Sequence, residues 1–217
     1  EAVELPINSR ANLISRMTLR GAGMGNTVLN CQSSSSVLSN GVTDIEYLSI
    51  EGITVDGQNQ GDFTGFVIGG FDEFPKFSRI KRCEAINCGP RGNNSTPSIL
   101  ISGGTGNRIE GCRASNCSSV SIEIKKGQNP VIRDCLVRNG NYQSNVGFCH
   151  GISAEKSKGG IIANNYIEGP AFGPSINVNN SGNFVVSGNL VRNVHRGIAN
   201  ANGGNLNTAI TGNVVRN

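Results

Sequence analysis

An octapeptide led by isoleucine recurs along the chain. The copy at 109–116 reads IEGCRASN, and the copies at 80–87 and 132–139 match it position by position. The lead residues of all copies are Leu19, Ile50, Ile80, Ile109, Ile132, Ile162, Val186 and Ile210. They are separated by 31, 30, 29, 23, 30, 24 and 24 residues. A repeat of this length indicates a stacked architecture, in which each copy packs on the next.

The composition narrows the choice of repeat. Leucine-rich repeats need a leucine ladder, and helical repeats need strong helix formers. This chain has neither, and 30 Gly and 29 Asn stand among its 217 residues. Gly and Asn favour turns, and β-branched residues between them favour short strands. We therefore predict an all-β fold, a single-stranded right-handed parallel β-helix of about eight coils stacked ~4.8 Å apart.

The columns of the repeat indicate which side chains point inward. The first and sixth positions are apolar in nearly every copy, so we expect them to stack in the core. A second strand precedes each copy by about ten residues, as in the segments 99–101, 122–124, 152–154 and 176–178. The fourth position changes along the chain and reads Ile53, Cys83, Cys112, Cys135, Asn165, Asn189 and Asn213. A buried Asn column is stable if each amide bonds the next, and the eighth position, usually Asn, is the expected turn.

Charge and hydropathy exclude two classes of partner. Charged residues make up only 16% of the chain, and the net charge is +4 without a dense basic face, so we expect no nucleic-acid partner. No apolar run approaches the ~18 residues of a membrane span. We expect one β-helix domain over residues 1–217. Because the chain begins at Glu1 and stops within a repeat, we expect a fragment that lacks coils or caps at one or both ends.

The seven cysteines form no zinc-type spacing. Cys83, Cys112 and Cys135 are expected in the core. Cys88 and Cys117 share a neighbouring column one coil apart, close enough for a disulfide. The alternative is a pair of stacked free thiols, and the sequence leaves both open.

The repeat resembles that of the pectin-lyase-like superfamily over nearly the whole chain. The segment 17–29, MTLRGAGMGNTVL, is similar to an early coil of that superfamily. Its members include pectate lyases, polygalacturonases, alginate epimerases and phage tailspikes. The resemblance implies a β-helix with a polysaccharide partner, located outside the cell, in the periplasm or on a virion surface.

The segment 150–153, HGIS, is similar to a polygalacturonase motif. That family hydrolyses its substrate with paired acids. Their places in this chain fall at Ser119 and Val120, with a further one near Pro97. We interpret the match as a shared β-helix pattern without the galacturonase acids.

Polar residues on the outer side of the second strand form the best candidate site. Glu123 and Lys125 project from one strand, Ser153 and Glu155 hold the matching places one coil on, and Asn177 and Asn179 follow. A polysaccharide lyase needs a group that neutralises a uronate carboxylate and a base for the C5 proton. The candidate catalytic residues are His150, Glu123, Glu155 and Lys125, and the candidate substrate-binding residues are Ser153, Asn177 and Asn179. The alternative is a solvated ladder with one Glu/Lys ion pair.

No cofactor is required by the sequence, although acids of this kind could hold Ca²⁺; the metal ligands stay unassigned. A second acidic spot, Asp72 and Glu73, lies among Phe71, Phe74 and Phe77. These rings could stack on sugars or cover the edge of the core.

Two hypotheses of function remain. The first is a carbohydrate-directed β-helix that binds or cleaves an extended, uronate-type polysaccharide along one outer sheet face. The second is a non-catalytic shaft or adhesin segment, such as a tailspike component, which would form a homotrimer.

Overall fold

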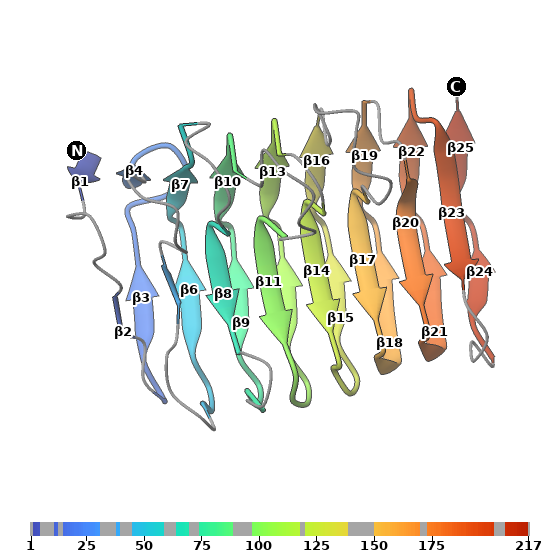
Figure 1. Ribbon diagram of the computed structural model, residues 1–217, viewed down its shortest axis with the longest axis horizontal. Helices are drawn as coiled ribbons and strands as arrows, with labels where there is room; N and C mark the ends of the chain where they lie inside the picture. The colour runs from blue at the N-terminus through green and yellow to red at the C-terminus, as the bar shows by residue number, and fades with distance from the viewer. Residues whose placement is uncertain are drawn as a thin grey trace.

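The computed structural model describes residues 2–4, 11–12, 15–30, 38–39, 45–58, 64–69, 74–88, 97–117, 120–138, 150–169, 173–201 and 207–216. All the strand pairs among them are parallel, and the strands stack side by side along one long axis (Figure 1). These residues contain no helix, and hence no helical segment that could cross a bilayer. The right-handed parallel β-helix predicted from the repeat is confirmed in its fold class.

Each coil contributes one strand to each of three sheets, in the order B, C, A. Sheet A consists of β1 (Ala2–Glu4), β4 (Val28–Asn30), β7 (Thr54–Asp56), β10 (Glu84–Ile86), β13 (Arg113–Ser115), β16 (Leu136–Arg138), β19 (Tyr166–Glu168), β22 (Leu190–Arg192) and β25 (Val214–Arg216). Sheet B consists of β2 (Ala11–Asn12), β5 (Leu38–Ser39), β8 (Phe66–Ile68), β11 (Ile99–Ser102), β14 (Ile122–Lys125), β17 (Ile152–Glu155), β20 (Pro174–Asn179) and β23 (Arg196–Ala201). Sheet C consists of β3 (Thr18–Arg20), β6 (Ser49–Glu51), β9 (Arg79–Lys81), β12 (Arg108–Glu110), β15 (Val131–Arg133), β18 (Lys158–Ala163), β21 (Gly182–Ser187) and β24 (Ala209–Thr211).

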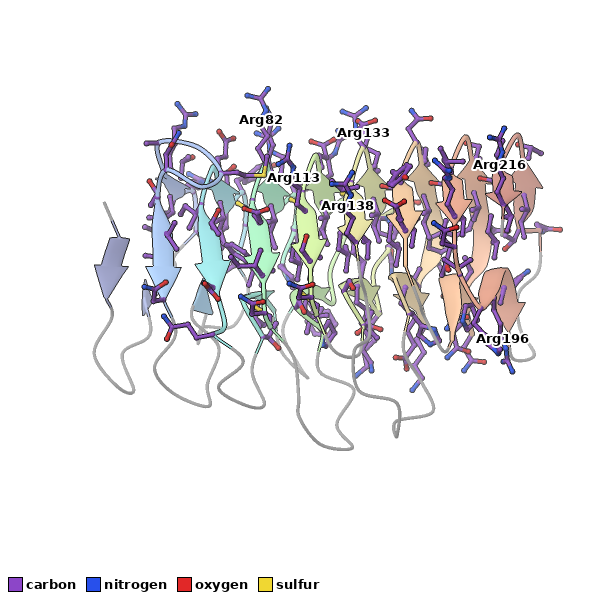
Figure 2. All side chains as sticks on the ribbon, turned by 90° about the horizontal axis from the view of Figure 1, so that it is seen from above. Arg82, Arg113, Arg133, Arg138, Arg196 and Arg216 are labelled. Carbon is purple, nitrogen blue, oxygen red and sulfur yellow. The ribbon has the colours of Figure 1, made fainter. Side chains whose placement is uncertain are left out.

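The register confirms the predicted columns. In sheet C, Ile80 pairs with Ile50 on one side and Ile109 on the other, and the column continues through Ile132. The sixth position forms the matching column in sheet A, and both columns are buried except in the end coils, where Ile210 and Val215 are exposed. Figure 2 shows side chains filling the space between the sheets, with Arg82, Arg113, Arg133, Arg138 and Arg216 along one long side of the molecule. The core is therefore a stack of like residues that runs the length of the helix.

The fourth position forms the expected small-residue ladder. Asn165 Nδ2 donates to Asn189 Oδ1 at 2.9 Å, and Asn189 Nδ2 donates to Asn213 Oδ1 at 2.8 Å. The same oxygens accept from backbone amides of the preceding coil, such as the Asn165 N–H at 2.9 Å. Because every amide has partners, burial of this column does not leave an unpaired group, which would cost ~1–3 kcal/mol.

The cysteines of the core are free thiols. Cys88 and Cys117 lie in neighbouring coils as the spacing predicts, yet no disulfide joins them. Each sulfur points at backbone carbonyl oxygens, for example Cys88 Sγ to the Ile86 oxygen at 3.2 Å. The hydrogen bond with Cys117 and burial both raise the pKa of the Cys88 thiol. Of the two alternatives for this pair, the stacked thiols are the one found.

The corners of the coil need residues with left-handed backbone. The predicted turn at the eighth position is confirmed, since Asn87, Asn116 and Asn193 have φ of 53°, 53° and 52°; Asn139 and Asn217 lie outside the described residues. A second left-handed corner lies just before six of the sheet C strands and at the second residue of β18 and β21; it is occupied by Arg16, Tyr47, Phe77, Gly106, Asn129, Gly159, Asn183 and Asn207. Left-handed backbone costs ~1–2 kcal/mol for a residue with a Cβ, and Gly or Asn tolerates it best.

Candidate functional site

The candidate residues occupy two adjacent outward columns of sheet B. Glu123 of β14 lies beside Ser153 of β17, and Ser153 lies beside Asn177 of β20. Two residues further along the same strands, Lys125 lies beside Glu155, which lies beside Asn179. The alternation of the strands explains this placement, because Ile122 and Ile124 point into the core on either side of Glu123.

One pocket of about 160 Å³ brings all the candidates together. Its lining consists of Val120, Glu123, Lys125, His150, Ser153, Glu155, Asn177 and Asn179. Every catalytic and substrate-binding candidate from the sequence is in this set. Val120, the position that the sequence comparison matched to one of the paired acids of polygalacturonases, also lines the pocket. We call this cavity the sheet B pocket.

Glu123 is far more buried than an outward position suggests. The residue is 5% exposed. The alternative interpretation of this face, a ladder of solvated side chains, predicts a much more exposed carboxylate. Burial raises the pKa of Glu123 to about 7, with the Lys125 ammonium opposing this effect and the Glu155 carboxylate adding to it. The carboxyl is therefore substantially protonated near neutral pH and can act as a proton donor.

Lys125 and Glu155 form a short ion pair at one side of the pocket. Lys125 Nζ lies 2.7 Å from Glu155 Oε2, and Lys156 Nζ lies 3.4 Å from the other oxygen. Burial acts to raise the pKa of Glu155, but the hydrogen bond and charge of Lys125, with those of Lys156, leave it below its ordinary value. Burial likewise acts to lower the pKa of Lys125, and the bond to Glu155 leaves it raised. Both groups are thus charged near neutral pH.

His150 is oriented by two contacts. Its Nδ1 lies 3.3 Å from the Pro174 carbonyl oxygen, which only accepts, so Nδ1 carries the proton. Its Nε2 lies 3.1 Å from Asn177 Nδ2 and accepts from it in the neutral ring. Burial lowers the pKa of His150, opposed by the Pro174 bond and the Glu155 charge. The imidazole is therefore neutral, and its basic nitrogen is hydrogen-bonded to Asn177, another residue of the pocket.

Asn177 leaves one polar atom without a partner. Its Oδ1 is buried and has no hydrogen bond among the described residues, while its Nδ2 contacts His150. An unpaired buried carbonyl is costly, and a ligand hydroxyl would satisfy it. The pocket is thus arranged to receive a hydrogen-bond donor.

The described residues of this pocket offer few free oxygen ligands to Ca²⁺. The ion takes 6–8 oxygen ligands in most protein sites. Here both oxygens of Glu155 face lysine ammonium groups, and burial favours the neutral form of Glu123. Among the described residues no three His, Cys, Asp or Glu gather as a metal site would require.

The second acidic segment that the sequence suggested, around Asp72 and Glu73, lies only partly among the described residues. Phe71, Asp72 and Glu73 lie outside the described residues. Phe74 and Phe77 are exposed by 57% and 51%, so neither ring is buried in the core.

The comparisons with known proteins agree with the fold. A family model described as "right handed beta helix region" matches residues 8–215. No curated protein matches the sequence. Among solved structures, the PL6 family alginate lyase AlyGC is 11% identical with a TM-score of 0.54, over 99% of this chain and 36% of that one. The chain thus spans about a third of the length of that enzyme.

Two further solved structures are more distant. The A-module of the Azotobacter vinelandii mannuronan C-5 epimerase AlgE6 is 15% identical with a TM-score of 0.38, over 84% of this chain and 62% of that one. The tailspike protein of E. coli bacteriophage HK620, in complex with a pentasaccharide, is 13% identical with a TM-score of 0.31, over 99% of this chain and 44% of that one. At these identities the likeness concerns the fold alone.

Proposed function

Because the chain belongs to the right-handed β-helix family, which presents flat parallel sheets outward, we propose that the sheet B pocket binds and cleaves a uronate-containing polysaccharide. The observation that carries the proposal is the gathering of an acid, a neutral imidazole and an ammonium in one pocket. The fold neighbour with the highest TM-score reported above is an alginate lyase, and this supports the class of substrate. An extended polymer as substrate goes with a location outside the cell, in the periplasm or on a virion.

The proposed reaction is β-elimination. The Lys125 ammonium lies against the uronate carboxylate and reduces its charge, which makes the C5 proton more acidic. Asn177 Nδ2 moves off His150 Nε2 as the sugar binds, and Nε2 then accepts this proton while the C4–C5 double bond forms and the C4–O4 bond breaks. Glu123 donates its proton to O4 as the leaving group departs.

The other pocket residues have supporting roles in this proposal. Glu155 holds Lys125 in place through the 2.7 Å ion pair. Ser153, Asn177 and Asn179 offer hydroxyl and amide groups to the sugar hydroxyls. No step depends on Ca²⁺, since Lys125 supplies the positive charge.

The test is incubation with polygalacturonate, alginate and other uronate polymers, followed by absorbance of unsaturated ends and by reducing-sugar release. We expect unsaturated ends from the wild type. Glu123→Gln and His150→Gln should each lower the rate roughly 10²-fold or more, the usual contribution of a general acid or base. Matched controls are Glu168→Gln on sheet A and His195→Gln outside the pocket, which should leave the rate within about twofold.

The readouts separate the alternatives. Reducing ends without unsaturation would replace elimination by hydrolysis, with Glu123 as the acid and Glu155 as the second carboxylate. Absence of both products on every polymer would refute cleavage.

A non-catalytic shaft is the second candidate function. It is favoured by the internal pairing of the pocket, in which Lys125 bonds Glu155 and His150 bonds Pro174. A shaft of the tailspike kind would assemble as a homotrimer. Sedimentation equilibrium measures the mass of the assembly. A mass of three copies, together with no cleavage of any polymer, would support this candidate over the enzyme.

A further inference from the structure

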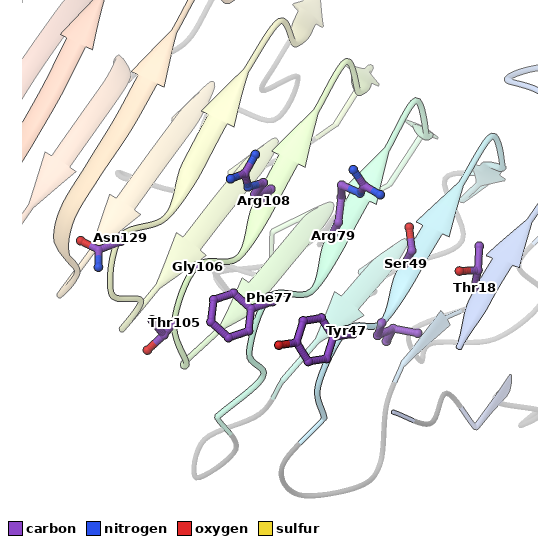
Figure 3. A pocket seen from close by; sticks show the side chains of 10 residues that line it. Thr18, Tyr47, Ser49, Phe77, Arg79, Thr105, Gly106, Arg108 and Asn129 are labelled. Carbon is purple, nitrogen blue, oxygen red and sulfur yellow. The ribbon is translucent and has the colours of Figure 1, made fainter. Parts of the chain in front are cut away.

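A second pocket, of about 560 Å³, lies on the outer face of sheet C (Figure 3). Two aromatic rings, Tyr47 and Phe77, lie side by side along it, and Arg79 and Arg108 project from β9 and β12 beside them. None of its lining residues belongs to the sheet B pocket. We call the two rings with the two arginines the aromatic platform.

The two rings present apolar surface to solvent. Tyr47 is 53% exposed and Phe77 is 51% exposed. Their centroids lie 5.3 Å apart with an angle of 19° between the planes. About half of each residue is therefore accessible to a ligand.

The backbone makes aromatic residues unexpected at these positions. Tyr47 and Phe77 have φ of 56° and 52°, and the same corner in later coils holds Gly or Asn, as at Gly106 and Asn129. Gly106 also makes room for the ring, because a Cβ there would lie 2.8 Å from Phe77 Cδ1. Because these rings keep about half of their surface exposed and adopt a costly backbone conformation, their placement points to a ligand.

The charges around the platform favour an anionic ligand that also carries hydroxyls. The outward residues of β3, β6, β9, β12 and β15 include five basic and two acidic side chains. Arg79 and Arg108, with side chains 40% and 53% exposed, lie 4.0 Å and 3.7 Å from Glu110. Arg79 also lies 3.6 Å from Glu51. Positive charge is in excess but alternates with carboxylates that can accept hydrogen bonds.

We propose that the aromatic platform is a non-catalytic binding site for an acidic polysaccharide. Sugar rings stack on Tyr47 and Phe77, and the guanidinium groups of Arg79 and Arg108 pair with uronate carboxylates. The choice of an acidic polysaccharide rests on the proposed function, whereas the existence of the site does not. A single-stranded nucleic acid also stacks on aromatic rings, but its uniform negative charge suits a surface with interleaved Glu51 and Glu110 poorly.

The experiment measures binding in a Glu123→Gln background, in which the proposed cleavage is slowed. The probes are polygalacturonate and alginate oligosaccharides, dextran as the neutral polymer, and a single-stranded oligonucleotide. The decisive variant is the double substitution Tyr47→Asn with Phe77→Asn, because Asn is the residue that this corner accepts in other coils. It should weaken uronate binding at least about tenfold while Tm stays equal or rises. Arg108→Gln should also weaken uronate binding, and Arg138→Gln, on sheet A, should not.

Each other outcome overturns the proposal. Unchanged uronate binding in the double variant would remove the platform as a site, and absence of any uronate binding by the parent protein would do the same. A fall in Tm of several degrees would assign the rings to structure, and preferential oligonucleotide binding would replace the sugar by a nucleic acid. Failure of the proposed function can be told apart from failure of the platform. If uronate binding depends on Tyr47 and Phe77 but no polymer is cleaved, only the proposed enzymatic activity is refuted.

Discussion

Glu123 combines an outward strand position with almost complete burial, and this combination sets its chemistry. Its folded-state pKa of about 7 lies above the ordinary value of 4.5. Below about pH 4.5 the group is neutral in both the folded and the unfolded chain and does not affect stability. As pH rises from there to about 7, the unfolded chain ionises first, so the folded state loses relative stability, and the loss is constant above this window.

Replacement of Glu123 by Gln should therefore stabilise the protein in a pH-dependent way. We expect the free energy of unfolding to rise by up to roughly 3 kcal/mol at about pH 8 and to change little at about pH 4, where both side chains are neutral. Denaturant titrations at both pH values measure this. The control is Glu168→Gln, which removes a partly exposed ion pair with Arg138 and should change stability by less than ~1 kcal/mol. An equal effect of Glu123→Gln at both pH values would contradict the burial argument.

At the level of the strands and corners, hydrogen bonds between coils act together with apolar stacking. Asn189 illustrates this, because its amide bonds Asn165 on one side and Asn213 on the other. It also donates to the Ile162 carbonyl oxygen at 3.0 Å. The column thus ties three coils at one corner.

Asn189→Ala should destabilise the chain by about 2–4 kcal/mol, because it leaves the Asn165 amide and the Ile162 oxygen unpaired in the core and opens a small cavity. The free energy of unfolding from urea titration measures this. The matched control is Asn116→Ala at an exposed corner, where the backbone preference and one long, exposed hydrogen bond to Asn87 are lost and about 1 kcal/mol is expected. A loss at Asn189 no larger than that at Asn116 would mean that the ladder does not bind the coils together.

Sequence analysis predicts the columns because they follow from a simple rule, that like residues recur at one place in each coil. The rule places Glu123, Ser153 and Asn177 in one column, and the register of β14, β17 and β20 confirms this placement. It does not predict the burial of Glu123, which depends on what covers the outer face. It also gives no warning of the aromatic platform, although Tyr47 and Phe77 at a corner usually filled by Gly or Asn are visible once the register is known.

At the scale of the whole molecule, the core is closed along its length by three sheets. All strand pairs among the described residues are parallel, and such pairing depends on contacts between distant parts of the chain. Within this core Cys83, Cys88, Cys112, Cys117 and Cys135 are buried free thiols. Their reactivity therefore reports whether the coils stay closed.

The native protein should expose few reactive thiols. Since five of the seven cysteines are buried, we expect no more than two to react quickly with an aromatic disulfide reagent, and all seven to react in denaturant. Counting released thiolate with and without denaturant tests this, and the denatured sample is the internal control. Three or more fast thiols in the native sample would show that the coils open.

The in-register stacking also governs how such a chain can change over generations. Coils of 23 residues and of 31 residues keep the same columns in register. Insertions or deletions between strands therefore leave the neighbouring coils unaltered. One residue gained inside a strand would instead reverse its inward and outward faces. Changes of length are therefore tolerated mainly in the connecting segments. A tandem duplication of one whole coil would stack on the original coil with every column in register.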